Sequence, residues 1–112
     1  MKLVQQIEVC FYQEESGNAP VRAWLQDLSQ DDRKIIGRDI KKIQISWPVN
    51  NLLVKPLGSK MWEIRTRLDN RIVRIIFVFH DSKIVLLHGF IKKTQKTPQQ
   101  EIDLAIKRFK TL

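Results

Sequence analysis

Cysteine is nearly absent from this sequence, since Cys10 is the only one among 112 residues. A lone thiol cannot form an internal disulfide, and it excludes zinc sites that are built from several cysteines. Cys10 falls in an apolar run typical of strands, which favours a buried and unreactive thiol. The fold must therefore depend on a hydrophobic core, for which an apolar content of 43% is sufficient.

The sequence has no apolar run near the ~18 residues of a membrane-spanning helix. Its N-terminal region contains Lys2 but no apolar stretch of signal-peptide length, because Glu8 interrupts the apolar residues there. These absences predict a cytoplasmic protein with no membrane association. The length is near that of one ordinary domain, so we expect a single domain over residues 1–112.

Missing motifs disfavour several enzyme classes. The sequence contains neither the G-x-x-x-x-G-K-[ST] phosphate loop nor a glycine-rich dinucleotide turn, and it has only four glycines. Its acidic residues form no cluster that would bind magnesium, and no Ser-His-Asp arrangement is evident. We therefore expect no metal and no cofactor, so any phosphodiester chemistry would proceed without metal.

Acidic residues are scarce in one part of the chain, and the resulting positive charge is local. The formal net charge is +8, yet residues 1–54 carry seven basic and seven acidic side chains. Residues 55–96 carry ten basic side chains against three acidic ones, a net charge of +7. Such a concentrated basic field attracts polyanions and speeds encounter with them, which favours RNA as the partner over a merely soluble basic surface.

Hydrophobic periodicity predicts seven elements in the order β-α-α-β-β-β-α, an α+β fold. The two helices after the first strand form an αα-hairpin. The three consecutive strands form an antiparallel sheet, because the turns at Asp69-Asn70 and Asp81-Ser82 are short. Residues 48–60 are predicted to be a loop. The expected strands cover 4–12, 61–68, 71–80 and 83–91, and the helices begin near residues 20, 30 and 98.

Polar residues ahead of each predicted helix indicate where it begins. Asn18 is the expected cap of the first helix, and Ser29 is the expected cap of the second. For the C-terminal helix we expect Thr97 as the cap, Pro98 at the first helical position and Gln100 completing a capping box.

Alternation along the strands places arginines on one face of the sheet. Glu63, Arg65 and Arg67 share a face of their strand, with successive members ~7 Å apart. In the next strand Arg74 lies opposite a fully apolar set, which we assign to the core. His88 lies on the side of Arg74 in the expected register, although a shift of one residue would reverse this. On its own strand, alternation groups His88 with Ile84, Leu86 and Phe90.

A concave face with these three arginines and His88 would suit a phosphodiester. Arginine binds phosphate oxygens through two parallel hydrogen bonds, and histidine can transfer a proton near neutral pH. Two alternatives stay open. The arginines could instead form salt bridges with Glu63 or Asp69, and His88 could be a half-buried imidazole satisfied by a partner.

The segment 92–97 adds positive charge ahead of the C-terminal helix. A helix N-terminus attracts phosphate through its N–H groups and its dipole, and the lysines and threonines of this segment reinforce the attraction. We therefore expect it to bind a nucleic-acid backbone, with a solubilising connector as the alternative. The residues concerned are Lys92, Lys93, Thr94, Lys96 and Thr97.

Three segments carry a likeness to a known family: WEIR at 62–65, RIVR at 71–74 and, above all, LLHGFIKKTQKTP at 86–98. They resemble the phage-derived, HigB-like branch of the RelE/ParE toxin superfamily. The similarity extends from the first strand to the last helix, and the predicted order of elements agrees with the fold of that superfamily. The resemblance implies a toxin of a type II toxin–antitoxin system.

Many RelE-like toxins cut mRNA in the ribosomal A site without metal, using the 2′-hydroxyl of the nucleotide as the nucleophile. The resemblance therefore implies an endoribonuclease, or mRNA interferase, whose arginines hold the scissile phosphate while a histidine or a lysine transfers protons. The catalytic set implied in this way is Arg65, Arg67, Arg74 and His88, and the RNA-binding set is Lys60, Lys92, Lys93, Thr94 and Lys96.

The resemblance also implies partners. These are the ribosome, mRNA and an antitoxin, commonly a helix-turn-helix protein through which the pair contacts operator DNA. Two rival functions remain. ParE-type toxins share the fold but poison DNA gyrase without cutting RNA, and a degenerate phage protein would only bind its partner.

An accessible Arg74 that holds phosphate leads to a direct prediction. Arg74→Ala should abolish growth arrest and leave folding and antitoxin binding intact, because only a surface contact would be lost. The growth of cells that express the variant measures this. Full toxicity of the variant would remove Arg74 from the site.

Overall fold

The computed structural model describes residues 7–48, 53–92 and 96–112, which form an α+β structure. None of the helices in these ranges is long and apolar enough to cross a membrane. All seven elements predicted from the sequence are present, and one further strand, β2, lies in the region predicted to be a loop. The elements are β1 (Glu8–Phe11), α1 (Pro20–Gln26), α2 (Gln30–Ser46), β2 (Val54–Gly58), β3 (Met61–Leu68), β4 (Arg71–His80), β5 (Lys83–Lys92) and α3 (Gln99–Phe109).

The strands form a mixed sheet in the order β1-β5-β4-β3-β2, so the prediction of an antiparallel sheet is only partly correct. Strands β2 to β5 are antiparallel neighbours, as their short connections require, but β1 pairs with β5 in parallel. Pro56 and Gly58 made the β2 segment resemble a loop. An edge strand tolerates proline, because one side of it has no neighbour to bond.

The helix caps follow the sequence in one case of three. Ser29 caps α2 as predicted, with its side chain accepting a hydrogen bond from the backbone N–H of Asp32. The expectation that Asn18 caps α1 is wrong, because the capping position is Ala19. Thr97 does not cap α3 either, since the capping position is Pro98. The hydroxyl of Thr97 has a different partner, described below.

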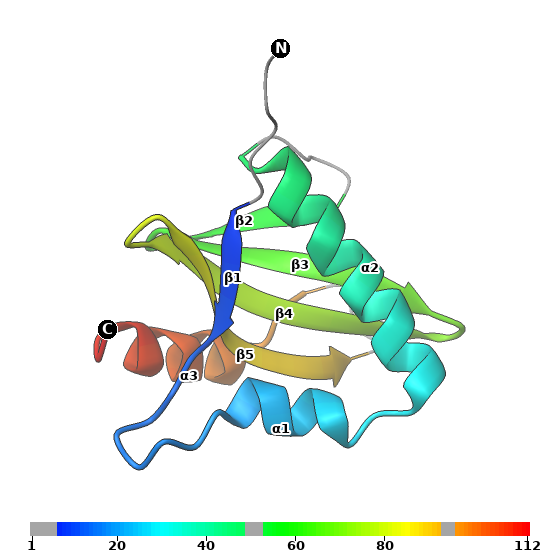
Figure 1. Ribbon diagram of the computed structural model, residues 1–112, viewed down its shortest axis with the longest axis horizontal. Helices are drawn as coiled ribbons and strands as arrows, with labels where there is room; N and C mark the ends of the chain where they lie inside the picture. The colour runs from blue at the N-terminus through cyan, green and yellow to red at the C-terminus, as the bar shows by residue number, and fades with distance from the viewer. Residues whose placement is uncertain (1–6, 49–52, 93–95) are drawn as a thin grey trace.

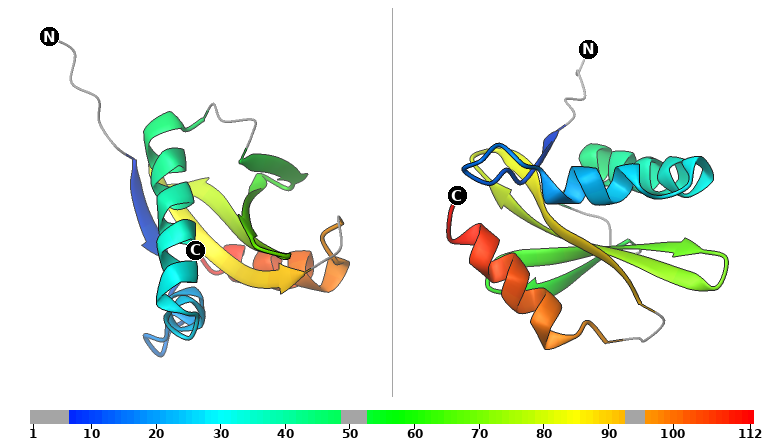
Figure 2. Two further views of the ribbon diagram at one scale, coloured as in Figure 1. Left: turned by 90° about the vertical axis from the view of Figure 1, so that its right-hand side faces the viewer. Right: turned by 90° about the horizontal axis from the view of Figure 1, so that it is seen from below.

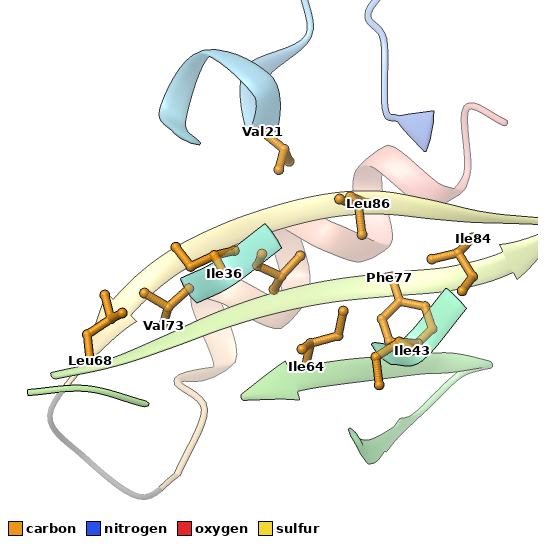
Figure 3. Close-up of a cluster of buried hydrophobic side chains, with 10 residues drawn as sticks. Val21, Ile36, Ile43, Ile64, Leu68, Val73, Phe77, Ile84 and Leu86 are labelled. Carbon is orange, nitrogen blue, oxygen red and sulfur yellow. The ribbon is translucent and has the colours of Figure 1, made fainter. Parts of the chain in front are cut away.

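Helices cover both faces of the sheet (Figures 1 and 2). Helices α1 and α2 lie on one face, and α3 lies on the other. Figure 3 shows the cluster beneath α1 and α2, where aliphatic side chains of both helices meet those of β3, β4 and β5. Each such buried side chain contributes about 1.5–3 kcal/mol by leaving water. The cluster includes Val21, Ile36, Ile43, Ile64, Leu68, Val73, Ile75, Phe77, Ile84 and Leu86.

A second buried cluster lies on the α3 face, so the sheet is apolar on both sides. Its helix contributes Ala105, with Ile102, Ile106 and Phe109 packed against the cluster, and these four residues form an apolar stripe along the last helix. The strands contribute Met61, Ile76, Val78, Val85, Leu87 and Phe90, together with Tyr12 just after β1.

A bulge in β5 decides which way His88 faces. Phe77 lies opposite Leu86 and Ile76 lies opposite His88, so Leu87 is an extra residue in the strand. Leu86 consequently belongs to the α1/α2 core, whereas His88 shares the α3 face with Ile76. The expected grouping of His88 with Leu86 on one face is therefore wrong. The expectation that His88 lies on the side of Arg74 is confirmed.

Glycine at position 89 is required by the packing of α1. A Cβ at Gly89 would lie 2.5 Å from Cζ3 of Trp24, too close for either group. Gly37, inside α2, has nothing within 4 Å of the corresponding position. The two glycines therefore form a matched pair for substitution.

Gly89→Ala should lower the free energy of unfolding by about 1–3 kcal/mol, because the new methyl group overpacks against the Trp24 ring. Gly37→Ala should raise it by about 0.5–1 kcal/mol, since alanine is the better helix former. Urea denaturation of both variants measures the difference. Equal stability of the two variants would contradict the close Gly89–Trp24 contact.

Candidate functional site

The α3 face of β3, β4 and β5 carries most of the polar residues selected from the sequence. Residues that lie opposite one another on neighbouring strands form rows across the sheet, and successive rows on one face are ~7 Å apart. The outer row lies nearest the β3–β4 turn. The outer row is Arg67–Ile72–Lys92, the middle row is Arg65–Arg74–Phe90 and the inner row is Glu63–Ile76–His88.

Glu63 is the centre of a buried polar cluster on this face. Its carboxylate accepts a hydrogen bond from Nε of Arg65 at 2.8 Å, and Nε of Arg74 lies 3.8 Å from the same oxygen. The hydroxyl of Thr97 donates to the other oxygen. Glu63 and Arg74 have no exposed surface, and Thr97 is 6% exposed. The cluster joins two strands to the segment that leads into α3.

Arg74 is not an accessible residue, which corrects the expectation of a surface pocket around it. Alternation in β4 leaves its second face open, but α3 packs on that face, and Arg74 has no exposed surface. Burial lowers the pKa of the guanidinium, Glu63 opposes this, and Arg65 adds to it. The salt-bridge alternative raised for the arginines is therefore realised for Arg65 and Arg74, with Glu63 as the shared partner.

His88 is held between two partners. Its Nε2 is hydrogen-bonded to a carboxylate oxygen of Glu101, in the first turn of α3, and its ring stacks on Phe90 with centroids 5.5 Å apart. The His88 side chain is 15% exposed and that of Glu101 is 16% exposed. Sequence analysis did not select Glu101. The available signal was an acid in the first turn of a helix, where the dipole favours negative charge.

An open basic surface remains beyond the cluster. The β3–β4 hairpin projects past α3 (Figure 2, right), and Arg67 at this end is exposed. Arg65 is 29% exposed, so it borders both the buried cluster and this surface. Lys55 lies across from Glu63 on β2, and its side chain and that of Lys96 are also exposed. The exposed part of the face is therefore cationic.

The remaining RNA-binding candidates are distributed differently. Lys60 precedes β3 at the end opposite Arg67, and the seven residues from Met61 to Arg67 alone span about 20 Å. The structure thus does not bring Lys60 to the arginines. Lys92 lies opposite Ile72 in the register, but its side chain lies outside the described residues, as do Lys93 and Thr94.

Other features of the described residues lie apart from these rows. One hollow of about 700 Å³ lies near the C-terminal end of α3 and is lined by Tyr12, Leu104 and Arg108, among others. The described part of the chain holds no group of three His, Cys, Asp or Glu side chains placed to bind a metal ion. Cys10 is only partly buried, which corrects the expectation of a buried thiol, but burial still raises the pKa of the thiol, with Lys83 opposing.

Comparison with known proteins places most of the chain in one family. Residues 23–110 match the family described as phage derived protein Gp49-like (DUF891). This range includes α2, strands β2 to β5 and α3, and thus all the residues of the three rows. A search of curated proteins found no match.

Because Glu63 and Arg74 form a buried pair, Arg74→Ala is no longer expected to leave folding intact. Arg74→Ala should destabilise the fold by about 3–5 kcal/mol, because it leaves a buried carboxylate with less compensation. Arg67→Ala, the same change at an exposed position of the same face, should stay within about 0.5 kcal/mol. Urea unfolding of both variants compares them directly. An Arg74→Ala variant as stable as Arg67→Ala would show that the pair is not buried in solution.

Proposed function

The chain belongs to the Gp49-like family of phage-derived proteins, a toxin-like family of the RelE/ParE type, and from this premise we propose that it is the toxin of a type II toxin–antitoxin pair. We further propose that it is a metal-independent, ribosome-dependent mRNA endonuclease. The observation that carries the proposal is the exposed cationic part of the α3 face, where Arg65 and Arg67 share one face of the sheet with His88.

The charge of this surface suits RNA. Residues 55–96, which supply β2 to β5, carry a net charge of +7. The Cα atoms of residues two apart on one strand face are ~7 Å apart, close to the spacing of successive phosphates in an RNA strand. Arg65 and Arg67 therefore present two cations to neighbouring phosphates, or two sides of one phosphate. The face is open because the hairpin projects past α3.

The proposed reaction uses the ribose 2′-hydroxyl, which only RNA offers. Its oxygen attacks the adjacent phosphorus, the bond to the 5′-oxygen of the next nucleotide breaks, and the products are a 2′,3′-cyclic phosphate and a 5′-hydroxyl. Arg65, one row from His88, stabilises the charge that develops on the phosphate oxygens. Arg67, two rows from His88, holds a neighbouring phosphate and so positions the RNA. His88 transfers a proton, and Arg74 acts from the interior by holding Glu63 in place.

Lysines extend the contact beyond the reacting phosphate. We propose that Lys92, Lys93 and Lys96, with Thr94, bind the backbone of mRNA or ribosomal RNA. The proposed antitoxin is a helix-turn-helix protein that covers the basic face and carries the pair to operator DNA.

One observation favours a rival function. Glu63 already engages Arg65 and Arg74, as expected for a toxin that binds a protein target such as DNA gyrase and has no need to grip phosphate. An inactive relic that only binds its partner would show the same engagement. The two functions differ in whether the toxin cuts RNA, so they can be separated by experiment.

The purified toxin should cut mRNA on translating ribosomes and leave 2′,3′-cyclic phosphate ends. Arg67→Ala should lower the cleavage rate by about 10²-fold, because the RNA loses a phosphate contact that positions it for reaction. Lys60→Ala removes the same charge about 20 Å away along β3 and should change the rate by less than about twofold, since surface charges that distant are screened. Primer extension and analysis of the RNA ends measure both effects.

Two results would count against the nuclease, and a third would count against a site at Arg67. Intact mRNA together with DNA damage would support the gyrase alternative, and intact mRNA without DNA damage would support the relic. Equal losses of activity in Arg67→Ala and Lys60→Ala would indicate a general effect of charge rather than a site at Arg67.

A further inference from the structure

Two polar contacts hold the start of α3, and the segment that leads into it, on the inner row of the sheet. Thr97 bonds to Glu63 on β3, and Glu101 bonds to His88 on β5. Ile76 of β4 lies between the two strand residues in the register. The helix start therefore spans the row, and each contact could serve simply to hold the helix on the sheet.

The contact of Glu101 with His88 has features that are not needed if it only holds the helix on the sheet. The Phe90 ring is stacked on the imidazole at 25°, so the plane of the imidazole is restrained while Glu101 restrains its rotation within that plane. Glu101 lies in the first turn of α3, where the helix dipole favours a carboxylate. Both side chains retain some exposure, 15% and 16%. The pair is thus oriented and still within reach of solvent.

An imidazole whose Nε2 is bonded to a carboxylate carries its proton on Nε2 when it is neutral. Its Nδ1 is then the acceptor, because a neutral imidazole has one donor nitrogen and one acceptor nitrogen. A carboxylate that fixes the tautomer and orientation in this way makes the opposite nitrogen available for proton transfer.

We infer that Glu101 is a positioning residue for His88, which it holds with Nε2 protonated and Nδ1 ready to accept a proton from the RNA. This rests on the proposed function. Nδ1 takes the proton of the 2′-hydroxyl as that oxygen bonds to phosphorus. The bond to the 5′-oxygen breaks, and the leaving oxygen takes its proton from solvent. His88 is then protonated, and it returns that proton to solvent.

The first test is a double-mutant cycle in ribosome-dependent cleavage. Glu101→Ala should lower kcat by about 10- to 100-fold, the range seen when a group that orients an imidazole is removed from a metal site, while KM changes less than about twofold. In a His88→Ala background the same change should have no further effect on kcat, because Glu101 acts only through His88.

The control is Asp103→Asn, which removes a carboxylate from the same helix. Asp103 is exposed and accepts a hydrogen bond from Gln99, so its loss should leave kcat unchanged. Thermal unfolding of each variant shows whether a loss of activity reflects a loss of structure. A structural tie alone would lower the stability of Glu101→Ala and of His88→Ala alike, because both changes break the same contact. The loss of kcat in Glu101→Ala would then follow its loss of stability, whereas a positioning role lowers kcat in a variant that is still folded.

The second test does not depend on activity. The chain has two histidines, so long-range ¹H–¹⁵N spectra at alkaline pH contain two imidazoles, with His80 as the internal reference. His88 should show the tautomer protonated at Nε2, and Glu101→Ala should convert it to a mixture. A wild-type His88 protonated at Nδ1 would overturn the inference even if the variant failed to fold.

The outcomes separate the inference from the function on which it rests. A wild-type toxin that cuts no RNA would refute the nuclease, and the catalytic role of the pair would fall with it. A wild-type toxin that cuts RNA, together with an unchanged kcat in Glu101→Ala, would refute only the positioning role.

Discussion

The arrangement of the α3 face depends on the carboxylate of Glu63, which is buried completely between the sheet and the start of α3. A charge in that position costs several kcal/mol unless cations and hydrogen-bond donors surround it. Arg65, Arg74 and Thr97 supply them. The same contacts that stabilise the carboxylate hold β3, β4 and the segment before α3 in one geometry. The cluster that keeps Arg74 in the interior therefore also sets the position of the exposed cationic surface next to it.

A single extra residue in β5 decides which face of the sheet His88 occupies. Without the bulge at Leu87, strict alternation would put His88 on the face of Leu86, beneath α1 and α2. The bulge allows one strand to supply aliphatic residues to the α1/α2 core and then an imidazole to the opposite face. Bulges often re-aim side chains next to functional sites. Gly89, which follows His88, accommodates the Trp24 ring of α1 from the other side.

These two features divide the basic residues into distinct classes. Arg74 is interior and neutralises a buried acid, Arg65 borders both environments, and Arg67 is exposed. Sequence alternation alone had placed all three together, and the register confirms that they share a face. Alternation could not predict how deeply each arginine is buried. It says which side of a sheet a residue occupies, and nothing about what covers that side.

The sequence alone determined the features that depend on neighbours in the chain. These are the main strands, the tight turns, the cap at Ser29, the apolar stripe of α3 and the local excess of positive charge. Only the tertiary structure decided which segments pair across long stretches of chain: the parallel partner of β1, the edge strand β2, the burial of Arg74, and the contacts of Thr97 and Glu101. Local features follow from steric and solvation preferences within a few residues. The others arise from packing between distant segments, where one helix can bury a strand face that alternation leaves open.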